Sequence, residues 1–569
     1  MSYSRLKQLE TYLRPHWRTV GVGTVALFAA NALGAYIPLL IRDSIDDLRQ
    51  AFDFNQVLRY VLLILVLASL MWVIRMVSRI AIFGIGRQVE FELKQSIFQH
   101  ILTLEPTYFA TQTIGDLMNR ATSDVDNIRR LVGFALLSAI NTVFAYGLTL
   151  PVMFGIDLRL SLAAIAVYPL MLITVQLFSG KLQSEQLAVQ QKLSNLSDLI
   201  QEDMSGMAAI KIYAQEENER RAFRDKNRQL LTANLRLAKI RSFLFPLIEG
   251  ISYLSLLVLL ALGTGAIAGG VITVGDFIAL LILVERLVFP TALLGFTITA
   301  YQRGEVSVDR VEAILQVQPQ IQEPANPLPL THVRGAIVAR HLSYTYPGSS
   351  TPALQDVTFN IQPGETVAIV GPIGSGKSTL ANTLPRLLDI PAGELFIDGQ
   401  DVTQVRLSEL RRAIAYVPQD SFLFSTSIQN NISYSDPLNE GRDVEYAAKQ
   451  AQIHPEILTF PQQYETIVGE RGITLSGGQR QRTALARALL VDAPVLVLDD
   501  ALSSVDNQTA TEILRNLSSG QPKTVLFISH QLSAAAQAER ILVMDRGKIV
   551  QIGTHEELLA VPGLDRKST

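Results

Sequence analysis

Leu475-Ser476-Gly477-Gly478-Gln479 lies about twenty residues before the aspartate that ends the apolar run at residues 495–499. The residues that follow it, 480–487, have helical composition, so the pentapeptide opens a helix. Ser476, Gly477 and Gly478 would present a hydroxyl and backbone N–H groups at the positive end of that helix, which suits a phosphate group. An isolated Ser-Gly-Gly sequence is more often only a turn, so the neighbouring motifs decide its meaning.

A second glycine-rich segment upstream, residues 371–378, matches the G-x4-G-K-[ST] phosphate-loop pattern at every required position. A short apolar strand precedes it and helical sequence follows, which is the context that the motif requires. The glycines let successive N–H groups face the phosphates, Lys377 supplies positive charge, and the Ser378 hydroxyl suits Mg²⁺. Pro385 predicts that the following helix is kinked or short. The predicted nucleotide-binding residues are Gly371, Gly374, Ser375, Gly376, Lys377, Ser378 and Thr379.

The N-terminal half of the chain contains six apolar segments, each long enough to cross about 30 Å of hydrocarbon as a helix. Basic residues gather on two long connections and on the N-terminus, so the positive-inside rule places these parts and both chain ends in the cytoplasm. The long connections have helical composition, so the spans are expected to continue beyond the membrane. Residues 2–17 are interpreted as an amphipathic interfacial helix. The six segments are residues 20–41, 57–83, 131–154, 160–178, 243–268 and 274–294.

The predicted organisation has three parts. Residues 1–315 form an all-α membrane domain of six helices with long cytoplasmic extensions, and the Pro-, Gln- and Asn-rich residues 316–332 form a linker. Residues 333–569 form an α/β P-loop NTPase domain with a helical subdomain around the pentapeptide. The formal net charge of -3 gives no reason to expect a nucleic-acid partner.

The order of these motifs resembles the ABC (ATP-binding cassette) superfamily, and the resemblance covers essentially the whole chain. Six spans fused to one cassette are similar to a half-transporter of the exporter type in a prokaryotic cytoplasmic membrane. The resemblance implies ATP and Mg²⁺ as cofactors. It also implies a dimer, because each ATP in this family lies between one chain's phosphate loop and the partner's signature motif. Ser476, Gly477, Gly478 and Gln479 would then contact nucleotide held by the partner.

The resemblance assigns roles to further residues. Asp499 would ligate Mg²⁺, and Gln419 would contact Mg²⁺ or the attacking water and report to the coupling helices. His530 would contact the γ-phosphate, and Tyr346, rather than Tyr344, would stack on adenine. Asp506 matches the D-loop, which contacts the other cassette. Two cytoplasmic stretches resemble coupling segments that press on the cassettes, and a third resembles an exporter-specific segment near the signature motif. The alternative for the first two is that they are solvated helix ends. The coupling candidates are Tyr108, Tyr213 and Glu470.

Asp500 occupies the position where most ATPases of this family have a glutamate that polarises the attacking water. A carboxylate shorter by one methylene retreats from the water by roughly 1 Å, which can cost about 100-fold in rate. Aspartate beside an intact signature motif favours a heterodimer in which this chain has the weaker hydrolytic site. The alternative is a homodimer with Asp500 as the base, and the presence of His530 supports it.

Charged residues inside the predicted spans require an explanation, since a bare charge in lipid is costly. Glu285 and Glu249 are candidates for a translocation cavity. In the alternative interpretation Glu285 pairs with an arginine of the bundle or of the partner, and this structural role is favoured for Arg286. The expected function is ATP-driven export of a hydrophobic, amphipathic or peptide substrate by alternating access. An ATP-gated channel and a regulatory subunit are the alternatives.

Overall fold

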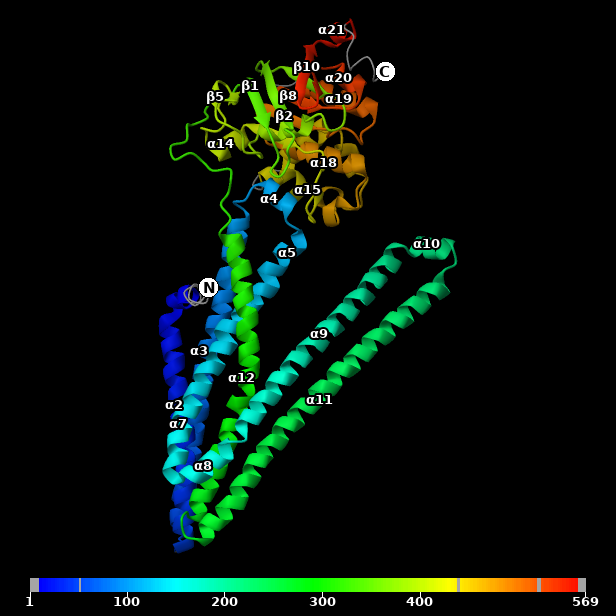
Figure 1. The fold of residues 1–569 in the computed structure, drawn as a ribbon. Helices are drawn as coiled ribbons and strands as arrows, with labels where there is room; N and C mark the ends of the chain where they lie inside the picture. Colours follow the sequence, from blue (N-terminus) through cyan, green and yellow to red (C-terminus); the bar gives the residue numbers. More distant parts are fainter. Residues whose placement is uncertain (1–9, 51–52, 437–440, 519–522, 561–569) are drawn as a thin grey trace. The chain divides into compact units, whose positions relative to one another are not determined.

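The computed structural model describes residues 10–50, 53–436, 441–518 and 523–560, and it divides into two compact units. The first unit comprises Met1–Leu102 and Thr113–Val317, and the second comprises Thr103–Gln112 and Gln318–Thr569. Figure 1 traces both units along the chain. Leu6 and Leu9 of the predicted interfacial helix lie outside the described residues, whereas the chain is helical from Glu10.

The described residues of the first unit form helices and short turns, and six of the helical runs among them are long and apolar enough to span a membrane, as predicted. Two of these helices extend well past the apolar segments that predicted them, α3 to Ile101 and α9 to Ser205. The fourth run is interrupted at Ala166 and Val167, because Pro169 lies in the first turn of α9, where proline is tolerated. The long helices are α2 (Trp17–Gln50), α3 (Phe54–Ile101), α7 (Leu136–Ile156), α8 (Leu158–Ile165), α9 (Tyr168–Ser205), α11 (Glu216–Ala268) and α12 (Val274–Leu315).

The helix that leads into α7 alternates between α and π geometry, which the sequence did not predict. It runs through α5 (Ile114–Asn119), η2 (Arg120–Asp124), α6 (Val125–Arg130) and η3 (Leu131–Ala135). The buried Asp124 accepts a 2.8 Å hydrogen bond from Ser307 Oγ and lies 3.3 Å from Arg310 Nε. Arg310 Nη2 also lies 2.6 Å from Asp116. These polar contacts tie α12 to the start of the third span.

α9 and α11 form a long helical hairpin with the short helix α10 (Met207–Ile212) at its tip (Figure 1). Ile212 and Tyr213 at this tip are 76% and 72% exposed. Apolar side chains exposed at the end of a long helical pair are available for contact with another surface.

The described residues of the second unit form two sheets. A four-stranded antiparallel sheet has the order β2-β1-β4-β5, and a six-stranded sheet has the order β10-β9-β3-β8-β7-β6. In the larger sheet β9, β3, β8, β7 and β6 are parallel, and β10 pairs antiparallel with β9. The strands are β1 (Ile337–Tyr344), β2 (Leu354–Ile361), β3 (Thr366–Val370), β4 (Leu395–Ile397), β5 (Gln400–Asp401), β6 (Ile414–Val417), β7 (Val495–Asp499), β8 (Thr524–Ile528), β9 (Arg540–Asp545) and β10 (Lys548–Gly553).

Every residue of β3, β7 and β8 is buried, as expected for central parallel strands covered on both faces. The carboxyl ends of parallel strands form the edge where open α/β sheets bind ligands. β3 ends at the phosphate loop, β7 ends at Asp499, and β8 ends two residues before His530. The topology therefore brings the motifs to one edge of the sheet.

Helices cover the large sheet and form the subdomain that carries the pentapeptide. α13 is short and ends before Pro385, which confirms the predicted effect of this proline. α4, from the first predicted coupling stretch, belongs to the second unit, where Glu105 Oε2 accepts a 3.2 Å hydrogen bond from Gln320 N. The helices are α4 (Pro106–Thr111), α13 (Lys377–Thr383), α14 (Leu407–Arg412), α15 (Ile428–Ile432), α16 (Gly441–Gln450), α17 (His454–Ile457), α18 (Gly477–Leu490), α19 (Asn507–Ser518), α20 (Leu532–Ala535) and α21 (His555–Ala560).

Candidate nucleotide-binding site

The phosphate loop between β3 and α13 depends on glycine for its conformation. Gly371, Gly374 and Gly376 have φ values of +151°, +79° and +97°. A Cβ added at Gly371 would lie 2.1 Å from the carbonyl oxygen of Met544, and one at Gly376 would lie 2.5 Å from that of Ala353. The loop thus combines unusual dihedral angles with close backbone packing, which only glycine permits.

Two donors converge inside this loop. Lys377 Nζ donates hydrogen bonds to the carbonyl oxygens of Gly371 and Pro372, at 2.8 and 2.9 Å. The Ser375 hydroxyl is buried and has no hydrogen-bond partner among the described residues. A buried donor without a partner is costly, and a phosphate oxygen would satisfy it. Burial lowers the pKa of Lys377, against the opposing effect of Asp500 and Asp499. The loop fits a nucleotide phosphate.

Two of the three predicted magnesium ligands, Ser378 and Asp499, lie together at the start of α13 and the end of β7. Ser378 Oγ donates a 2.8 Å hydrogen bond to Asp499 Oδ1. The Tyr416 hydroxyl lies 3.3 Å from Asp499 Oδ2 and 2.8 Å from Asn382 Oδ1. Burial raises the pKa of Asp499, and the hydrogen bonds from Ser378 and Tyr416 oppose this effect. A hydroxyl and a carboxylate at hydrogen-bond distance fit Mg²⁺, which binds through oxygen ligands.

Asp500 lies next to the other predicted catalytic groups. It is buried and has a left-handed φ of +50°. Burial raises the pKa of Asp500, and His530, Lys377, Gln419 and Ser503 act in the opposite direction. The structure thus places His530 and Gln419, from two other segments, within interaction range of Asp500. A non-glycine residue at positive φ is rare and indicates that the surroundings fix the direction of this carboxylate.

The predicted adenine platform lies at the entrance to the phosphate loop. The Tyr346 hydroxyl lies 3.2 Å from Thr379 Oγ1, immediately after the loop. Its ring meets Tyr344 edge to face, with 5.0 Å between centroids. Tyr344 is the more buried of the two, whereas Tyr346 is 36% exposed and has a ring face available for stacking. The stacking of Tyr346 on adenine stays a prediction.

The signature pentapeptide caps α18. Ser476 Oγ accepts a 3.2 Å hydrogen bond from Gln479 N, and Gln479 Oε1 accepts a 2.9 Å hydrogen bond from Ser476 N. This reciprocal pair is a capping box. Gln479 Nε2 also donates to Glu456 Oε2 at 2.9 Å, and Glu456 forms a 2.6 Å ion pair with Arg482. The side chain of Gln479 thus supports the start of its own helix.

The same helix holds the D-loop, through a residue whose role sequence reasoning missed. Gln481 Nε2 donates to Ser503 Oγ at 3.0 Å, and Gln481 Oε1 accepts from Ser504 N at 2.9 Å. A Cβ at Gly478 would lie 2.8 Å from the Ser504 carbonyl oxygen. Asp506, at the end of this loop, is exposed, and a hydrogen bond from Thr509 N lowers its pKa. Gln481 is a polar residue that becomes buried in α18, and its burial is not visible in the sequence.

We expect Gln481→Ala to destabilise the cassette by about 1 to 3 kcal/mol, because Ser504 N then loses its acceptor. Ser503 Oγ also loses the donor that Gln481 supplies, although it still donates to the Asp500 carbonyl oxygen. ATP turnover should fall by about tenfold, since Ser503 and Ser504 lose their support. Gln462→Ala removes the same group from an exposed position and should change neither quantity. Thermal unfolding and ATPase rates of the purified chain check both effects. Unchanged turnover in Gln481→Ala would contradict this role.

Glu470, from the segment that resembles the exporter-specific one, and Gln419 line the same cavity. A cavity of about 850 Å³ is lined by Gln419, Glu470, Arg480, Gln481 and Ser503, among others. Glu470 belongs to a single helical turn, Glu470–Gly472. Of the other coupling candidates, Tyr108 is in α4 of the second unit and Tyr213 follows α10 in the first. Their coupling roles stay predictions.

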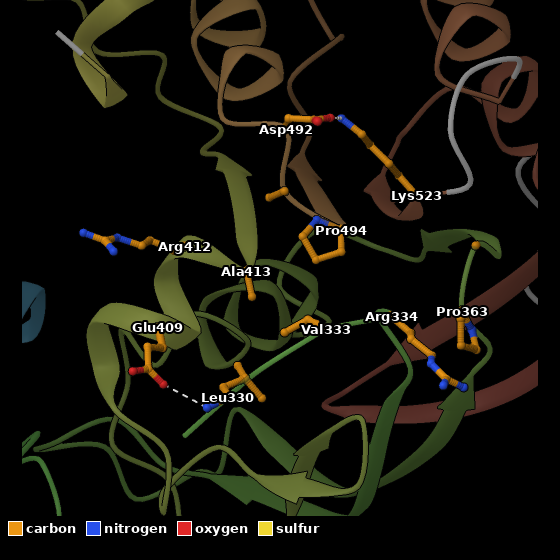
Figure 2. Close-up of a pocket in the computed structure, with 12 residues that line it drawn as sticks. Leu330, Val333, Arg334, Pro363, Glu409, Arg412, Ala413, Asp492, Pro494 and Lys523 are labelled. Carbon is orange, nitrogen blue, oxygen red and sulfur yellow. Dashed lines mark hydrogen bonds and ion pairs between the residues drawn. The ribbon is translucent and has the colours of Figure 1, made fainter. Parts of the chain in front are cut away.

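Figure 2 shows a further cavity of the second unit, which is not at the carboxyl edge of the large sheet. It has a volume of about 730 Å³ and is lined by residues that precede strands, including Ala413, Pro494 and Lys523. Lys523 forms a 2.6 Å ion pair with Asp492. The cavity therefore lies at the amino ends of β6, β7 and β8, opposite to the nucleotide motifs, and none of the predicted site residues lines it.

In the first unit, Glu285 lines a cavity of about 650 Å³ together with Arg286. Arg286 Nη2 donates to the carbonyl and side-chain oxygens of Asn31, at 2.8 and 3.0 Å. Among the described residues no ion pair joins Glu285 to Arg286. Glu249 is not one of the residues that line this cavity, and it accepts a 2.9 Å hydrogen bond from Tyr253. Arg75 and Arg79 also line the cavity, and sequence reasoning overlooked them although both lie inside a predicted span.

Comparisons with known proteins agree with these two units. The model of the ABC transporter transmembrane region matches residues 20–291, and the model of the ABC transporter family matches residues 354–503. The chain is 33% identical to a probable multidrug resistance ABC transporter ATP-binding/permease protein of Bacillus subtilis, over 99% of this chain and 97% of that protein. It is 32% identical to an ATP-dependent lipid A-core flippase of Syntrophus aciditrophicus, over 98% and 92% of the two chains. A bacterial Atm1-family ABC exporter with ATP bound has the same fold, with a TM-score of 0.77 at 24% identity over 98% of both chains.

Proposed function

Because the chain belongs to the ABC transporter family, as a half-transporter of the exporter type, we propose that it exports a hydrophobic or amphipathic substrate by ATP-driven alternating access. The chain is a multi-pass membrane protein of the plasma membrane, and its cassette is an ATPase that uses ATP with Mg²⁺. The observation that carries the proposal is the convergence of Lys377, Ser378, Asp499 and Asp500 at one edge of a sheet fused to six spanning helices. The relatives' names, multidrug resistance and lipid A-core flippase, support an apolar or amphipathic substrate.

We propose the following roles for the site residues, from the resemblance of their motifs and from the positions of their side chains. Lys377 and Ser375 hold the phosphates, Ser378, Gln419 and Asp499 hold Mg²⁺, and Tyr346 stacks on adenine. When bound, Mg²⁺ neutralises charge on the phosphate oxygens. Asp500 orients the water and accepts its proton, and His530 contacts the γ-phosphate. The signature residues Ser476, Gly477, Gly478 and Gln479 close over the nucleotide of a partner chain, with Asp506 at the same contact.

Force transmission to the membrane helices starts at α4. Residues 103–112 group with the cassette, and the chain continues directly into α5 of the membrane unit. There Arg310 of α12 binds both Asp116 and Asp124. A shift of α4 therefore pulls on a polar cluster that includes α12, the helix that carries Glu285. Tyr108, Tyr213 and Glu470 are the coupling contacts in this proposal.

The organisation proposed here assigns residues 1–315 to the membrane domain, 316–332 to the linker and 333–569 to the cassette. Both chain ends face the cytoplasm, as the distribution of basic residues indicates. The export function is tested by reconstituting the full chain, with a co-purifying partner if there is one, in liposomes that contain a fluorescent phospholipid. MgATP should move the lipid between leaflets, and Lys377→Ala should abolish this movement. ATP hydrolysis without ATP-dependent movement of any amphipathic probe would contradict export.

We further propose that the functional dimer is a heterodimer in which this chain has the weaker hydrolytic site. Asp500 is shorter than glutamate, and a misplacement of about 1 Å can cost about 100-fold in rate. The signature motif is intact and forms a regular capping box, so it can complete a partner's site. In the alternative, a homodimer, Asp500 is a functional base, and the position of His530 beside it favours that arrangement.

The chain purified alone separates these two arrangements. If the dimer is a heterodimer, we expect slow ATP turnover by this chain. Asp500→Glu should raise it by about 10- to 100-fold, because the longer side chain brings the carboxylate back to the water. Asp500→Asn should cause no further loss, because the carboxylate that it removes is already too far from the water to act. Asp389→Asn removes a half-exposed carboxylate of the same cassette and serves as the matched control. Robust turnover that Asp500→Asn abolishes would contradict the heterodimer and support the homodimer.

A further inference from the structure

The membrane unit contains a cavity whose lining combines several charges with aromatic side chains. Its volume is about 650 Å³, and α2, α3, η3, α7 and α12 contribute to it. The charged side chains are Arg75 and Arg79 on α3 and Glu285 and Arg286 on α12. Three arginines against one glutamate give the lining a net positive charge. The apolar part is formed by Leu27, Phe83, Phe134, Leu137, Ala145, Phe289, Pro290 and Leu293.

The arrangement of these arginines is unfavourable without a counter-charge. Arg75 and Arg79 are four residues apart on one helix face, a spacing at which like charges destabilise a helix. Arg286 on α12 adds a third positive charge to the lining of the same cavity. Charged side chains in a spanning helix normally pair with one another or face a cavity. Three guanidinium groups that line one cavity therefore need an anion to balance their charge.

The cavity supplies little negative charge of its own. None of Arg75, Arg79 and Arg286 forms an ion pair with a carboxylate in the described part of the chain, and Glu285 is the one acidic residue of the lining. Within the described residues, the hydrogen bond found for Arg75 is a 3.7 Å contact from its Nη2 to the sulfur of Met71. A guanidinium has five N–H donors, so most donors of Arg75 remain available.

Arg286 is held in place by neutral groups. Asn31 accepts from its Nη2 twice, and Asn31 Nδ2 in turn donates to Leu27 O at 2.9 Å and to Asn141 Oδ1 at 3.1 Å. A Cβ at Gly34 would lie 1.6 Å from Arg286 Nη1, so the absence of a side chain at Gly34 makes room for the guanidinium. Three helices thus position this charge without neutralising it.

We propose that this cavity binds the anionic headgroup, a phosphate or carboxylate, of an amphipathic substrate, with its apolar chain against the phenylalanine rings. This inference rests on the proposed export function and names the substrate class of that function. Planar guanidinium groups bind such anions through two parallel hydrogen bonds, which are stronger than neutral ones. The cavity has the size of a small-molecule site, and its mixed lining matches a charged head next to a hydrocarbon chain.

Binding without ATP tests the substrate class separately from transport. The probes are dodecyl phosphate and dodecyltrimethylammonium, which share the apolar chain, added to the full chain in nanodiscs of zwitterionic lipid. We expect dodecyl phosphate to bind at least tenfold more tightly than the cation. The double substitution Arg75→Gln/Arg79→Gln should weaken it by about 10- to 100-fold, and Arg75→Lys/Arg79→Lys should restore part of the affinity. Glu285→Gln should strengthen it, because the one opposing charge is removed.

Arg159→Gln removes one positive charge from α8, outside the cavity, and should leave the affinity unchanged. Equal binding of the two probes, or equal loss in Arg159→Gln and in the double variant, would overturn the proposal. Should the double variant fail to fold, weaker dodecyl phosphate binding in Glu285→Gln would overturn it. Anion binding that follows these expectations in a chain without ATP-driven lipid movement would instead contradict the export function and leave the anion site standing.

Discussion

Replacing Lys377 by alanine is expected to lower ATP turnover at this chain's phosphate loop by about 100- to 1,000-fold, the usual cost of losing one preorganised charge at a reacting group. The Lys377 ammonium lies inside the loop, at hydrogen-bond distance from the carbonyl oxygens of Gly371 and Pro372. MgATP supplies phosphate oxygens as stronger acceptors for it. Binding of MgATP to the purified chain should weaken by at least about tenfold.

Binding should be measured next to turnover, because the binding loss is expected whether or not Asp500 hydrolyses ATP quickly. Lys449→Ala is the matched control, since this lysine forms an exposed i,i+4 ion pair with Glu445 in α16. Such a pair contributes less than about 1 kcal/mol, so neither binding nor turnover should change. Wild-type affinity for MgATP in Lys377→Ala would show that the nucleotide binds elsewhere.

Gly371→Ala should be among the most destabilising single substitutions in the cassette. Its Cβ would lie 2.1 Å from a carbonyl oxygen of β9, at Met544, where the backbone cannot move without distorting the sheet. The φ of +151° adds strain for any side chain. We expect a cost of about 2 to 5 kcal/mol from overpacking and strain together. This corresponds to a fall of about 5 to 15 °C in the unfolding temperature of a domain of this size.

Gly374→Ala separates the two causes. Gly374 also has a positive φ, of +79°, but a Cβ there meets nothing within 4 Å. It should cost only about 1 to 2 kcal/mol, the penalty for a left-handed conformation. Thermal unfolding of the full chain with and without MgATP measures both variants. Equal destabilisation by the two substitutions would show that the dihedral angle, and not the contact with Met544, sets the cost.

The six spans and the nucleotide site were predictable because their signals are local in the sequence. An apolar segment of about twenty residues is sufficient to identify a spanning helix. The glycines of residues 371–378 likewise form one short motif, and strand-end residues such as Asp499 meet wherever parallel strands end at one edge. Pro385 limited the length of α13 for an equally local reason.

Other features depend on contacts between distant residues, which periodicity does not contain. The π turns around Asp124 accompany its contacts with Ser307 and Arg310, nearly two hundred residues later. The hydrogen bonds from Gln481 to Ser503 and Ser504 of the D-loop depend on how α18 packs, so they could not be predicted from the sequence. Arg75 and Arg79 are different, since two charges inside an apolar segment are visible in the sequence, but their common cavity with Arg286 appears only once α3 and α12 are placed.

The capping of α18 by Ser476 leaves one part of its hydroxyl group uncommitted. The cap uses a lone pair of the oxygen, which accepts from Gln479 N, and it does not use the hydrogen. The helix start therefore fixes where the oxygen is while the hydrogen can rotate outward to an acceptor on another molecule. Aspartate could replace the cap but would repel an anion, and alanine would lose both functions. Serine at this position is suited to hold its own helix and to recognise a phosphate at the same time.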